Sequence, residues 1–122
     1  MIKIPIIILN YNSSDDCLKC IGYLKQQKGV ETEIVVVDNC SPHNGEIDDI
    51  KHLCKKEQCT FIQAKENRGY NAGNNIGLRY AASKGYEYAL IANPDMEFPQ
   101  ADYIAKLTAC IKIDEKIVVV GS

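Results

Sequence analysis

Four short runs of apolar residues constrain the fold of this chain more than any other feature of its sequence. The runs read Ile-Ile-Ile-Leu at 6–9, Ile-Val-Val-Val at 34–37, Ala-Leu-Ile-Ala at 89–92 and Ile-Val-Val-Val at 117–120. Within each run the apolar residues are continuous and do not alternate with polar ones. Strands of this kind are buried on both faces, which is typical of a parallel sheet covered by helices.

Amphipathic segments alternate with these runs along the chain. The pattern predicts strands at about 2–9, 33–38, 60–64, 86–92 and 116–120. It predicts helices up to about 27, at about 46–57 and 70–84, and after Pro99. Ser13 is the expected N-cap of the first helix, with Asp16 completing a capping box. We therefore predict one α/β domain over residues 1–122, with a doubly wound, mostly parallel sheet of about five strands, helices on both faces and right-handed connections.

Polar residues follow four of the predicted strands. They are Asn10 and Tyr11 after the first strand, Asp38 after the second, Arg68 and Gly69 after the third, and Asn93 and Asp95 after the fourth. The carboxyl ends of parallel strands share one edge of the sheet, where open α/β sheets bind their ligands. This edge therefore combines an aromatic ring, carboxylates, a guanidinium and amides, which suit a base, a ribose and a diphosphate.

The segment Asn93-Pro94-Asp95 predicts a metal ion at the same edge. It follows a strand that the sequence predicts to be buried. The metal ligands that its side chains offer are oxygen atoms. Such ligands suit a hard divalent cation, which often accompanies a phosphate. We therefore predict that Asp95 binds Mg²⁺ or Mn²⁺ beside a nucleoside diphosphate.

Each of these side chains also has an ordinary structural explanation. Asp38 could cap a turn with Ser41, Arg68 could pair with Glu66, and Tyr11 could be a surface aromatic residue. The functional interpretation depends on their convergence at one edge of the sheet.

Three glycines in the third predicted helix give a further indication. Gly69, Gly73 and Gly77 are spaced four residues apart and share one helix face. Glycine within a helix costs about 0.5–1 kcal/mol relative to alanine, so the bare face should serve a purpose. We expect Gly77 to permit close packing and Gly69 to provide ligand access or an unusual backbone angle.

Composition excludes several classes of protein. A formal charge of -2 gives no basic surface for nucleic acid, and no apolar run approaches the ~20 residues that span a bilayer. We predict a cytoplasmic location, with membrane association of a longer protein left open. Of the six cysteines, Cys17 and Cys20 form a CxxC pair that we interpret as buried core residues of a helix, because no second pair accompanies it.

The motifs resemble those of glycosyltransferase family 2, the inverting group with the GT-A fold, a Rossmann-like nucleotide-sugar transferase architecture. The matching segments are 6–12, 35–41, 66–77 and 93–95, in the order in which the family carries them. The Asn-Pro-Asp form resembles a rhamnosyltransferase-like subgroup that often uses UDP- or dTDP-sugars. The resemblance covers essentially the whole chain.

The resemblance implies a role for each residue of the edge. Tyr11 and Asp38 would hold the base beside Asn10; Arg68, next to Gly69, would close over the base or diphosphate; Asn93 would approach the ribose or donor; and Asp95 would bind Mg²⁺ or Mn²⁺. It implies metal-assisted transfer of a sugar, with inversion, to the hydroxyl of a saccharide or lipid-linked acceptor, as in cell-wall or polysaccharide biosynthesis.

Two departures from the family pattern matter. Asn93 replaces the first aspartate of the usual metal motif, which makes Asp95 more important. The chain is also shorter than family members, whose second half supplies the acceptor site and the general base. We therefore predict no catalytic residue in this chain, weak or absent activity on its own, and self-association through apolar surface exposed near residues 116–120.

Three alternatives compete with this interpretation. A signalling receiver domain has the right length, but it requires acidic residues after its first strand, where this chain has Asn10-Tyr11-Asn12. A nucleotidyltransferase would need a glycine-rich loop there. A non-catalytic nucleotide-binding module remains compatible with the sequence.

Overall fold

The computed structural model describes residues 3–42 and 46–92, which form seven helices and strands. In chain order they are β1 (Lys3–Asn10), α1 (Ser14–Lys25), β2 (Glu31–Asp38), α2 (Glu46–Lys56), β3 (Thr60–Gln63), α3 (Tyr70–Ser83) and β4 (Leu90–Ala92). Strands and helices alternate throughout, as the sequence predicts.

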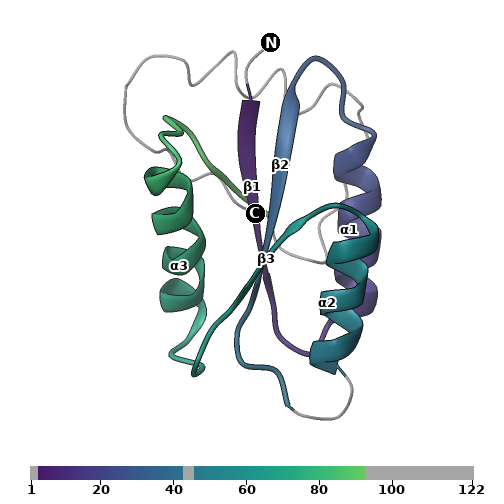
Figure 1. The fold of residues 1–122 in the computed structure, drawn as a ribbon, viewed down its shortest axis with the longest axis vertical. Coiled ribbons are helices and arrows are strands. Elements are labelled where there is room, and N and C mark those ends of the chain that lie inside the picture. Colours follow the sequence, from purple (N-terminus) through teal and green to yellow (C-terminus); the bar gives the residue numbers. More distant parts are fainter. Residues whose placement is uncertain (1–2, 43–45, 93–122) are drawn as a thin grey trace.

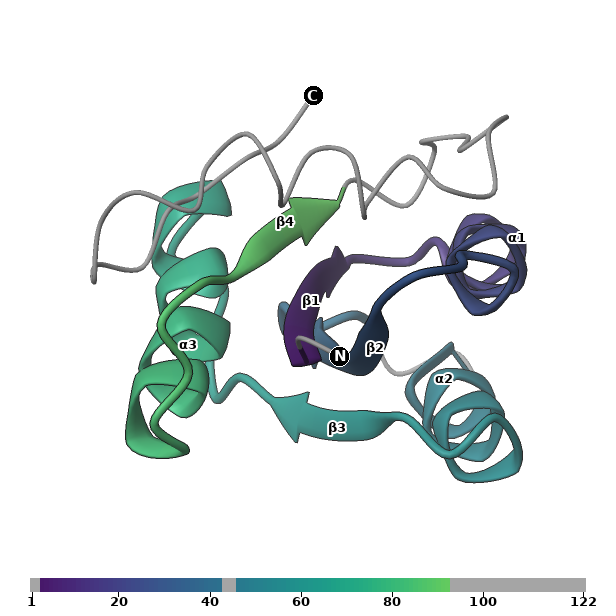
Figure 2. The same ribbon diagram turned by 90° about the horizontal axis from the view of Figure 1, so that it is seen from above.

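The described strands form one parallel sheet with the order β3-β2-β1-β4 (Figure 1). Helices α1 and α2 cover one face and α3 covers the other, as the view from above shows (Figure 2). The chain moves outward from β1 to β3 and then crosses back to β4. Because right-handed crossovers in opposite directions place their helices on opposite faces, this order explains why α3 lies alone. The sheet is therefore doubly wound, as predicted.

The strand order also excludes the receiver alternative. Receiver domains follow the flavodoxin-like order 2-1-3-4-5, whereas β1 here lies between β2 and β4 and β3 lies at the outer edge. The observed order is that of a Rossmann half-sheet, whose switch point falls between β1 and β4.

Two apolar clusters fill the space between the sheet and the helices. Side chains at even positions of β1 and β2, including Ile6 and Val36, pack under α1 and α2. Side chains at odd positions, including Ile7 and Val35, pack under α3. Both sets are buried, which confirms that the continuous apolar runs serve two faces of one sheet.

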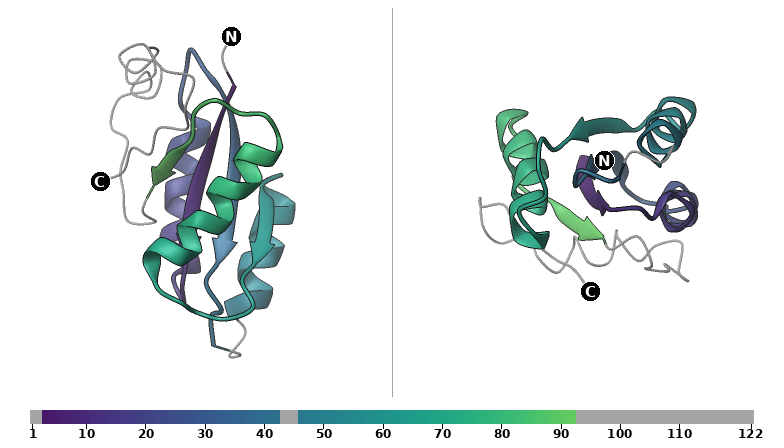
Figure 3. Two further views of the ribbon diagram at one scale, coloured as in Figure 1. Left: turned by 90° about the vertical axis from the view of Figure 1, so that its left-hand side faces the viewer. Right: turned by 90° about the horizontal axis from the view of Figure 1, so that it is seen from below.

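Helix α3 lies along one face of the sheet (Figure 3), and it approaches the sheet closely because glycines face it. A Cβ atom on Gly77 would lie 2.5 Å from Cγ2 of Ile7, and one on Gly73 would lie 2.5 Å from Cδ1 of Leu9. The packing role predicted for Gly77 is confirmed. Gly69 is the N-cap of α3 rather than a helical residue, and its φ of 99° confirms the unusual backbone angle.

The predicted capping box at α1 is wrong. Ser13 is the N-cap, but its hydroxyl donates to the carbonyl of Tyr11 at 2.9 Å and makes no cap hydrogen bond. The amide of Ser14 instead donates to Glu46 of α2. A partner from another helix has replaced the local cap.

The fourth strand is shorter than the predicted 86–92. The amide of Tyr86 donates to the carbonyl of Ala81 at 3.2 Å, so the chain is still leaving α3 there, and β4 begins at Leu90. The predicted helix after Pro99 and strand at 116–120 lie outside the described residues. Within the described ranges, no helix combines the length and hydrophobicity needed to cross a membrane.

Candidate functional site

A row of three polar side chains ends the first three strands at their carboxyl edge. Asn10, Asp38 and Gln63 are register partners in β1, β2 and β3. The amide nitrogens of Asn10 and Gln63 each donate to the Asp38 carboxylate at 2.9 Å. The parallel register therefore converts three residues, distant in the sequence, into one hydrogen-bonded row.

Asp38 is fully buried at the centre of this row. Its carboxylate also accepts from the backbone amide of Ser41 at 3.0 Å and from the Ser41 hydroxyl at 2.6 Å. Burial acts to raise the pKa of Asp38, but the hydrogen bonds from Ser41, Asn10 and Gln63 outweigh it and lower the pKa below its ordinary value. The carboxylate stays ionised and ties two strands to the turn after β2.

The turn after β2 in turn holds the loop after β1. The hydroxyl of Ser41 accepts from the backbone amide of Asn12 at 2.9 Å. Asn12 and Cys40 adopt left-handed backbone angles, with φ of 52° and 59°. Such angles are uncommon for residues other than glycine and often occur at functional sites, where surrounding contacts hold them. Both loops are thus fixed against each other.

Glu46 is the first residue of α2, and its side chain lies at the N-terminus of α1. Its carboxylate accepts from the Ser14 amide at 2.7 Å, from the Ser14 hydroxyl at 3.0 Å, and from the Asn10 side chain at 3.5 Å. Dinucleotide-binding folds use this helix N-terminus to bind a pyrophosphate. Here a carboxylate of the same chain fills that position, so a diphosphate would have to be bound elsewhere along the edge.

The loop after β3 joins the same assembly through Asn39. The side-chain amide of Asn39 donates to Asn67 at 3.2 Å and to the carbonyl of Gly69 at 3.5 Å. Asn67 also accepts from the Gly69 amide at 2.9 Å, which sets the turn into α3. Three loops at the carboxyl edge are therefore linked by side chains.

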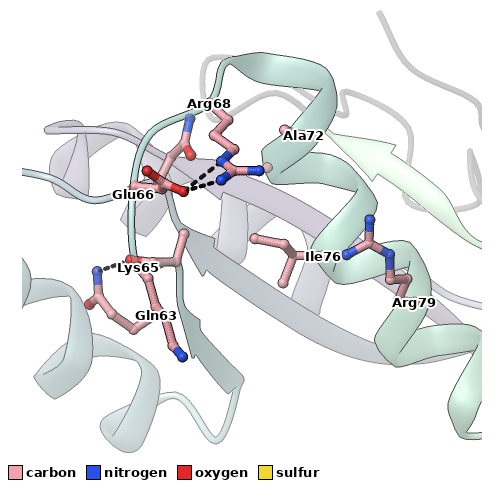
Figure 4. A pocket seen from close by; sticks show the side chains of 10 residues that line it. Gln63, Lys65, Glu66, Arg68, Ala72, Ile76 and Arg79 are labelled. Carbon is pink, nitrogen blue, oxygen red and sulfur yellow. Dashed lines mark hydrogen bonds and ion pairs between the residues drawn. The ribbon is translucent and has the colours of Figure 1, made fainter.

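A cavity of about 330 Å³ opens beside this third loop, between the end of β3 and α3. Its lining includes Lys65, Arg68 and Arg79, with Ile76 between α3 and the sheet (Figure 4). Arg68 is largely exposed and pairs with Glu66 at 2.5 Å. The cavity volume is at the lower end of the range for small-molecule sites, and its lining carries three cationic side chains and one carboxylate.

The structure describes five of the predicted site residues and shows what surrounds each of them. Tyr11 is 49% exposed on the loop after β1 and does not line the cavity, whereas Asn10 and Asp38 are fully buried and hydrogen-bonded to each other. Arg68 makes the surface pair with Glu66 that was the structural alternative to a ligand contact, and a Cβ atom on Gly69 would meet open space. Their roles toward a ligand stay predictions. Asn93 and Asp95 lie outside the described residues.

The predicted metal site cannot be built from the described residues. Within 3–42 and 46–92, no group of three histidine, cysteine or acidic side chains could hold a metal ion. The prediction therefore depends on Asp95.

Two structurally important residues, Gln63 and Glu46, were missed from the sequence. Gln63 could have been found from strand register, since it lies opposite Asp38. Ser41 was not missed: the sequence indicated it as the partner of Asp38 in a turn, and both hydrogen bonds from Ser41 to Asp38 are present. Glu46 gives no local signal, because its partners are 32 and 36 residues earlier in the chain.

The CxxC pair is part of the core, as predicted. Cys17 and Cys20 are fully buried against the sheet, and Cys17 donates to the Asn10 side chain at 3.1 Å. Burial raises the pKa of the Cys17 thiol well above its usual value, and it raises the pKa of Cys54 to about 12. These thiols are therefore protonated and unreactive at neutral pH.

The strand order and polar carboxyl edge define a doubly wound α/β protein. Within this class, the chain belongs to glycosyl transferase family 2, whose family model matches residues 6–122. It is 34% identical over 100 residues to the low-salt glycan biosynthesis hexosyltransferase Agl10 of Haloferax volcanii. That match covers 81% of this chain but only 30% of the relative, so the chain spans a minor part of the relative's length.

Solved structures agree on the fold. The mannosyltransferase PcManGT of Pyrobaculum calidifontis, in complex with GDP-Man and Mn²⁺, superposes with a TM-score of 0.71 at 23% identity, over 84% of this chain and 30% of that chain. S. aureus TarS 1–349, in complex with UDP-GlcNAc, gives a TM-score of 0.69 at 24% identity, over 90% and 31% of the two chains. The predicted GT-A architecture is confirmed.

Proposed function

We propose that this chain is the donor-binding part of a glycosyltransferase that uses a nucleotide-diphosphate sugar. The observation that carries the proposal is the assembly of three linked loops at the carboxyl edge of a family 2 chain. These loops are fixed by partly buried hydrogen bonds, from Asn12 to Ser41 and from Asn39 to Asn67, before any ligand arrives, which reduces the entropy cost of binding. PcManGT and TarS, which share the fold, bind GDP-Man and UDP-GlcNAc respectively, and this likeness supports a nucleotide-sugar donor.

Tyr11 and Arg68 are the side chains best placed to contact the base and the diphosphate. Both are exposed at the edge, one on the loop after β1 and the other on the loop after β3. Tyr11 would stack on the base, and Arg68 would exchange Glu66 for a phosphate or lie against the base. Asn10 and Asp38 are buried below these loops and would set their shape. Either could bind the base only by giving up one of its hydrogen bonds within the protein.

A divalent cation bound by Asp95 completes the proposal. The Glu46 carboxylate fills the N-terminus of α1, so the negative charge of a leaving diphosphate needs another source of stabilisation. Mg²⁺ or Mn²⁺ would supply it, and the Mn²⁺ in the PcManGT complex supports this choice. The residues of the described edge would bind and orient the donor.

The family resemblance supports a proposal for the donor base, the acceptor and the stereochemistry. We propose a UDP- or dTDP-linked donor, a saccharide or lipid-linked acceptor hydroxyl, transfer with inversion, and a cytoplasmic site of action. The general base that deprotonates the acceptor would come from residues beyond this chain.

Calorimetric titration tests the proposal. The protein in its full natural reading frame is titrated with UDP, dTDP, GDP and CDP, with and without Mn²⁺. We expect metal-dependent binding of one nucleotide, its loss in Asp95→Ala, and its weakening in Tyr11→Ala. Glu87→Ala removes an exposed carboxylate ahead of β4 and serves as the matched charge control.

Two results would contradict the proposal. Absence of binding for all four nucleotides would exclude a donor site, and equal metal dependence in Asp95→Ala and wild type would exclude Asp95 as the metal ligand. Anomeric analysis of the transferred sugar separately tests inversion.

A further inference from the structure

Glu46 links three elements that carry the carboxyl edge. It begins α2, yet it accepts both hydrogen bonds from Ser14 at the start of α1 and a longer one from Asn10 at the end of β1. The first of these, from the Ser14 amide to Oε1, is 2.7 Å. A carboxylate that accepts from a backbone amide at a helix N-terminus forms a charge-assisted hydrogen bond and interacts favourably with the helix dipole.

The loop from Tyr11 to Ser13 is therefore held at two points. The Asn12 amide is bound by Ser41 at 2.9 Å, and the Ser14 amide at the end of the loop is bound by Glu46. Ser13 does not perform this function: its hydroxyl donates to the carbonyl of Tyr11 and makes no cap hydrogen bond. Tyr11 lies just before the first anchor and directly after Asn10, whose side chain also contacts Glu46, so contacts on both sides of Tyr11 fix its backbone.

We propose that Glu46 is a positioning residue of the donor site. Its carboxylate holds the loop after β1 so that the ring of Tyr11 is oriented for the base of the nucleotide. This inference rests on the proposed function. Because Glu46 acts on the loop that faces the base, its removal weakens recognition of the nucleoside and leaves the contribution of the diphosphate and metal unchanged.

Helix α2 itself offers a control for a purely structural role of Glu46, in which its charge would only stabilise the N-terminus of the helix. Asp48 and Asp49 also lie in the first turn of α2, where negative charge stabilises the helix N-terminus. Asp49→Asn therefore removes the same charge from the same helix end, at an exposed side chain, and is the matched control. Ser14→Ala removes only the hydroxyl contact and keeps the amide bond to Glu46.

The first test needs no ligand. Amide hydrogen exchange of Ser14 is compared among wild type, Glu46→Ala, Glu46→Gln and Asp49→Asn in the full reading frame. We expect about tenfold faster exchange in Glu46→Ala, because local opening then exposes the amide more often, and no change in Asp49→Asn. Unchanged exchange in Glu46→Ala would overturn the proposal directly.

The second test measures the affinity for the nucleotide that wild type binds most tightly, and for its monophosphate. Loss of a preorganising contact in Glu46→Ala should weaken both by about tenfold, because an unfixed loop must be ordered on binding. Glu46→Gln keeps one acceptor oxygen and should recover part of the affinity. Asp49→Asn and Ser14→Ala should bind as wild type does, and Mn²⁺ dependence should be unchanged.

The outcomes separate this inference from the proposed function. If wild type binds none of the four nucleotides, both fail. If wild type binds and Glu46→Ala binds equally well, or loses only thermal stability, Glu46 has a structural role and the positioning proposal alone is overturned. Glu46→Gln keeps the test decisive if the alanine variant does not fold.

Discussion

The two ends of the sheet each carry an acidic side chain that collects several hydrogen bonds, yet they are built differently. At the amino end, Glu33 of β2 accepts from the hydroxyls of Thr60, Tyr80 and Tyr86 at 2.9, 2.5 and 2.6 Å. At the carboxyl end, Asp38 of the same strand accepts two hydrogen bonds from neighbouring strands and two from the turn that follows it.

The difference lies in what each carboxylate holds. All three of these partners of Glu33 are hydroxyl groups of residues in or next to β3 and α3. At this end the carboxylate therefore joins β3 and α3 to β2. The partners of Asp38 include a loop amide, and Ser41 passes the linkage on to the amide of Asn12. Carboxylate networks alone therefore do not identify a site; the carboxyl end is distinguished because its network fixes loops.

The largest expected effect is on the free energy of unfolding, and it should distinguish Asp38 from Glu33. Asp38→Asn places an amide among four donors and leaves buried groups unsatisfied, so we expect a loss of about 2–4 kcal/mol in the free energy of unfolding. Glu33→Gln, at the less buried end, should cost about 1 kcal/mol. Urea denaturation measures both, with exposed Glu87→Gln as the control. Equal losses would show that the two networks do not differ in burial.

The next effect compares two glycines with left-handed angles at opposite ends of α3. Gly69, with φ of 99°, precedes α3 at the carboxyl end of the sheet, and Gly85, with φ of 83°, follows α3 at the amino end of the sheet; a Cβ atom added to either would meet no other atom within 4 Å. Each alanine substitution should cost about 1–2 kcal/mol through backbone strain. Only Gly69→Ala should weaken nucleotide binding, because only Gly69 belongs to a site loop. Parallel affinity losses would remove the distinction between the ends.

A smaller effect concerns the tyrosines of the amino end. Burial, followed by the hydrogen bond to Glu33, raises the pKa of Tyr86 to about 12. Since the pKa in the folded state lies above the unfolded value of about 10, this stabilisation is complete below that pH and is lost as the pH rises toward 12.

Tyr86→Phe tests this assignment by removing the hydrogen bond. We expect a loss of about 1 kcal/mol at neutral pH, a weaker dependence of stability on alkaline pH, and unchanged nucleotide affinity. Thermal unfolding as a function of pH provides the measurement, and ultraviolet titration follows the tyrosines. A steeper alkaline loss in the variant would show that another group is responsible.

The smallest effect on stability is expected at Arg68. Its pair with Glu66 is exposed, so Arg68→Ala should change the free energy of unfolding by less than about 0.5 kcal/mol. Nucleotide affinity should nevertheless fall. Arg79 lines the same cavity from further along α3, and Arg79→Ala should leave affinity unchanged. If Arg79→Ala is the more damaging variant for binding, the ligand lies deeper beside α3 than proposed.

Much of the fold could be predicted because its signals are local. Continuous apolar runs at 6–9 and 34–37 require two covered faces, and the observed clusters under α1, α2 and α3 supply them. Boundaries failed where a tertiary contact replaced a local one, as at Ser13, where Glu46 performs the expected capping, and at Tyr86, whose amide still bonds to α3.

The site divides along the same line. The sequence determined that polar residues follow the strands and that a parallel sheet gathers them at one edge, because strand direction places every carboxyl end on the same side. Only the tertiary structure decided that Asn10 and Asp38 are buried anchors while Tyr11 and Arg68 face outward. Register between strands and the approach of α2 to α1 determine which polar atoms are already paired, and those distances depend on residues about 30 positions apart, which no local pattern records.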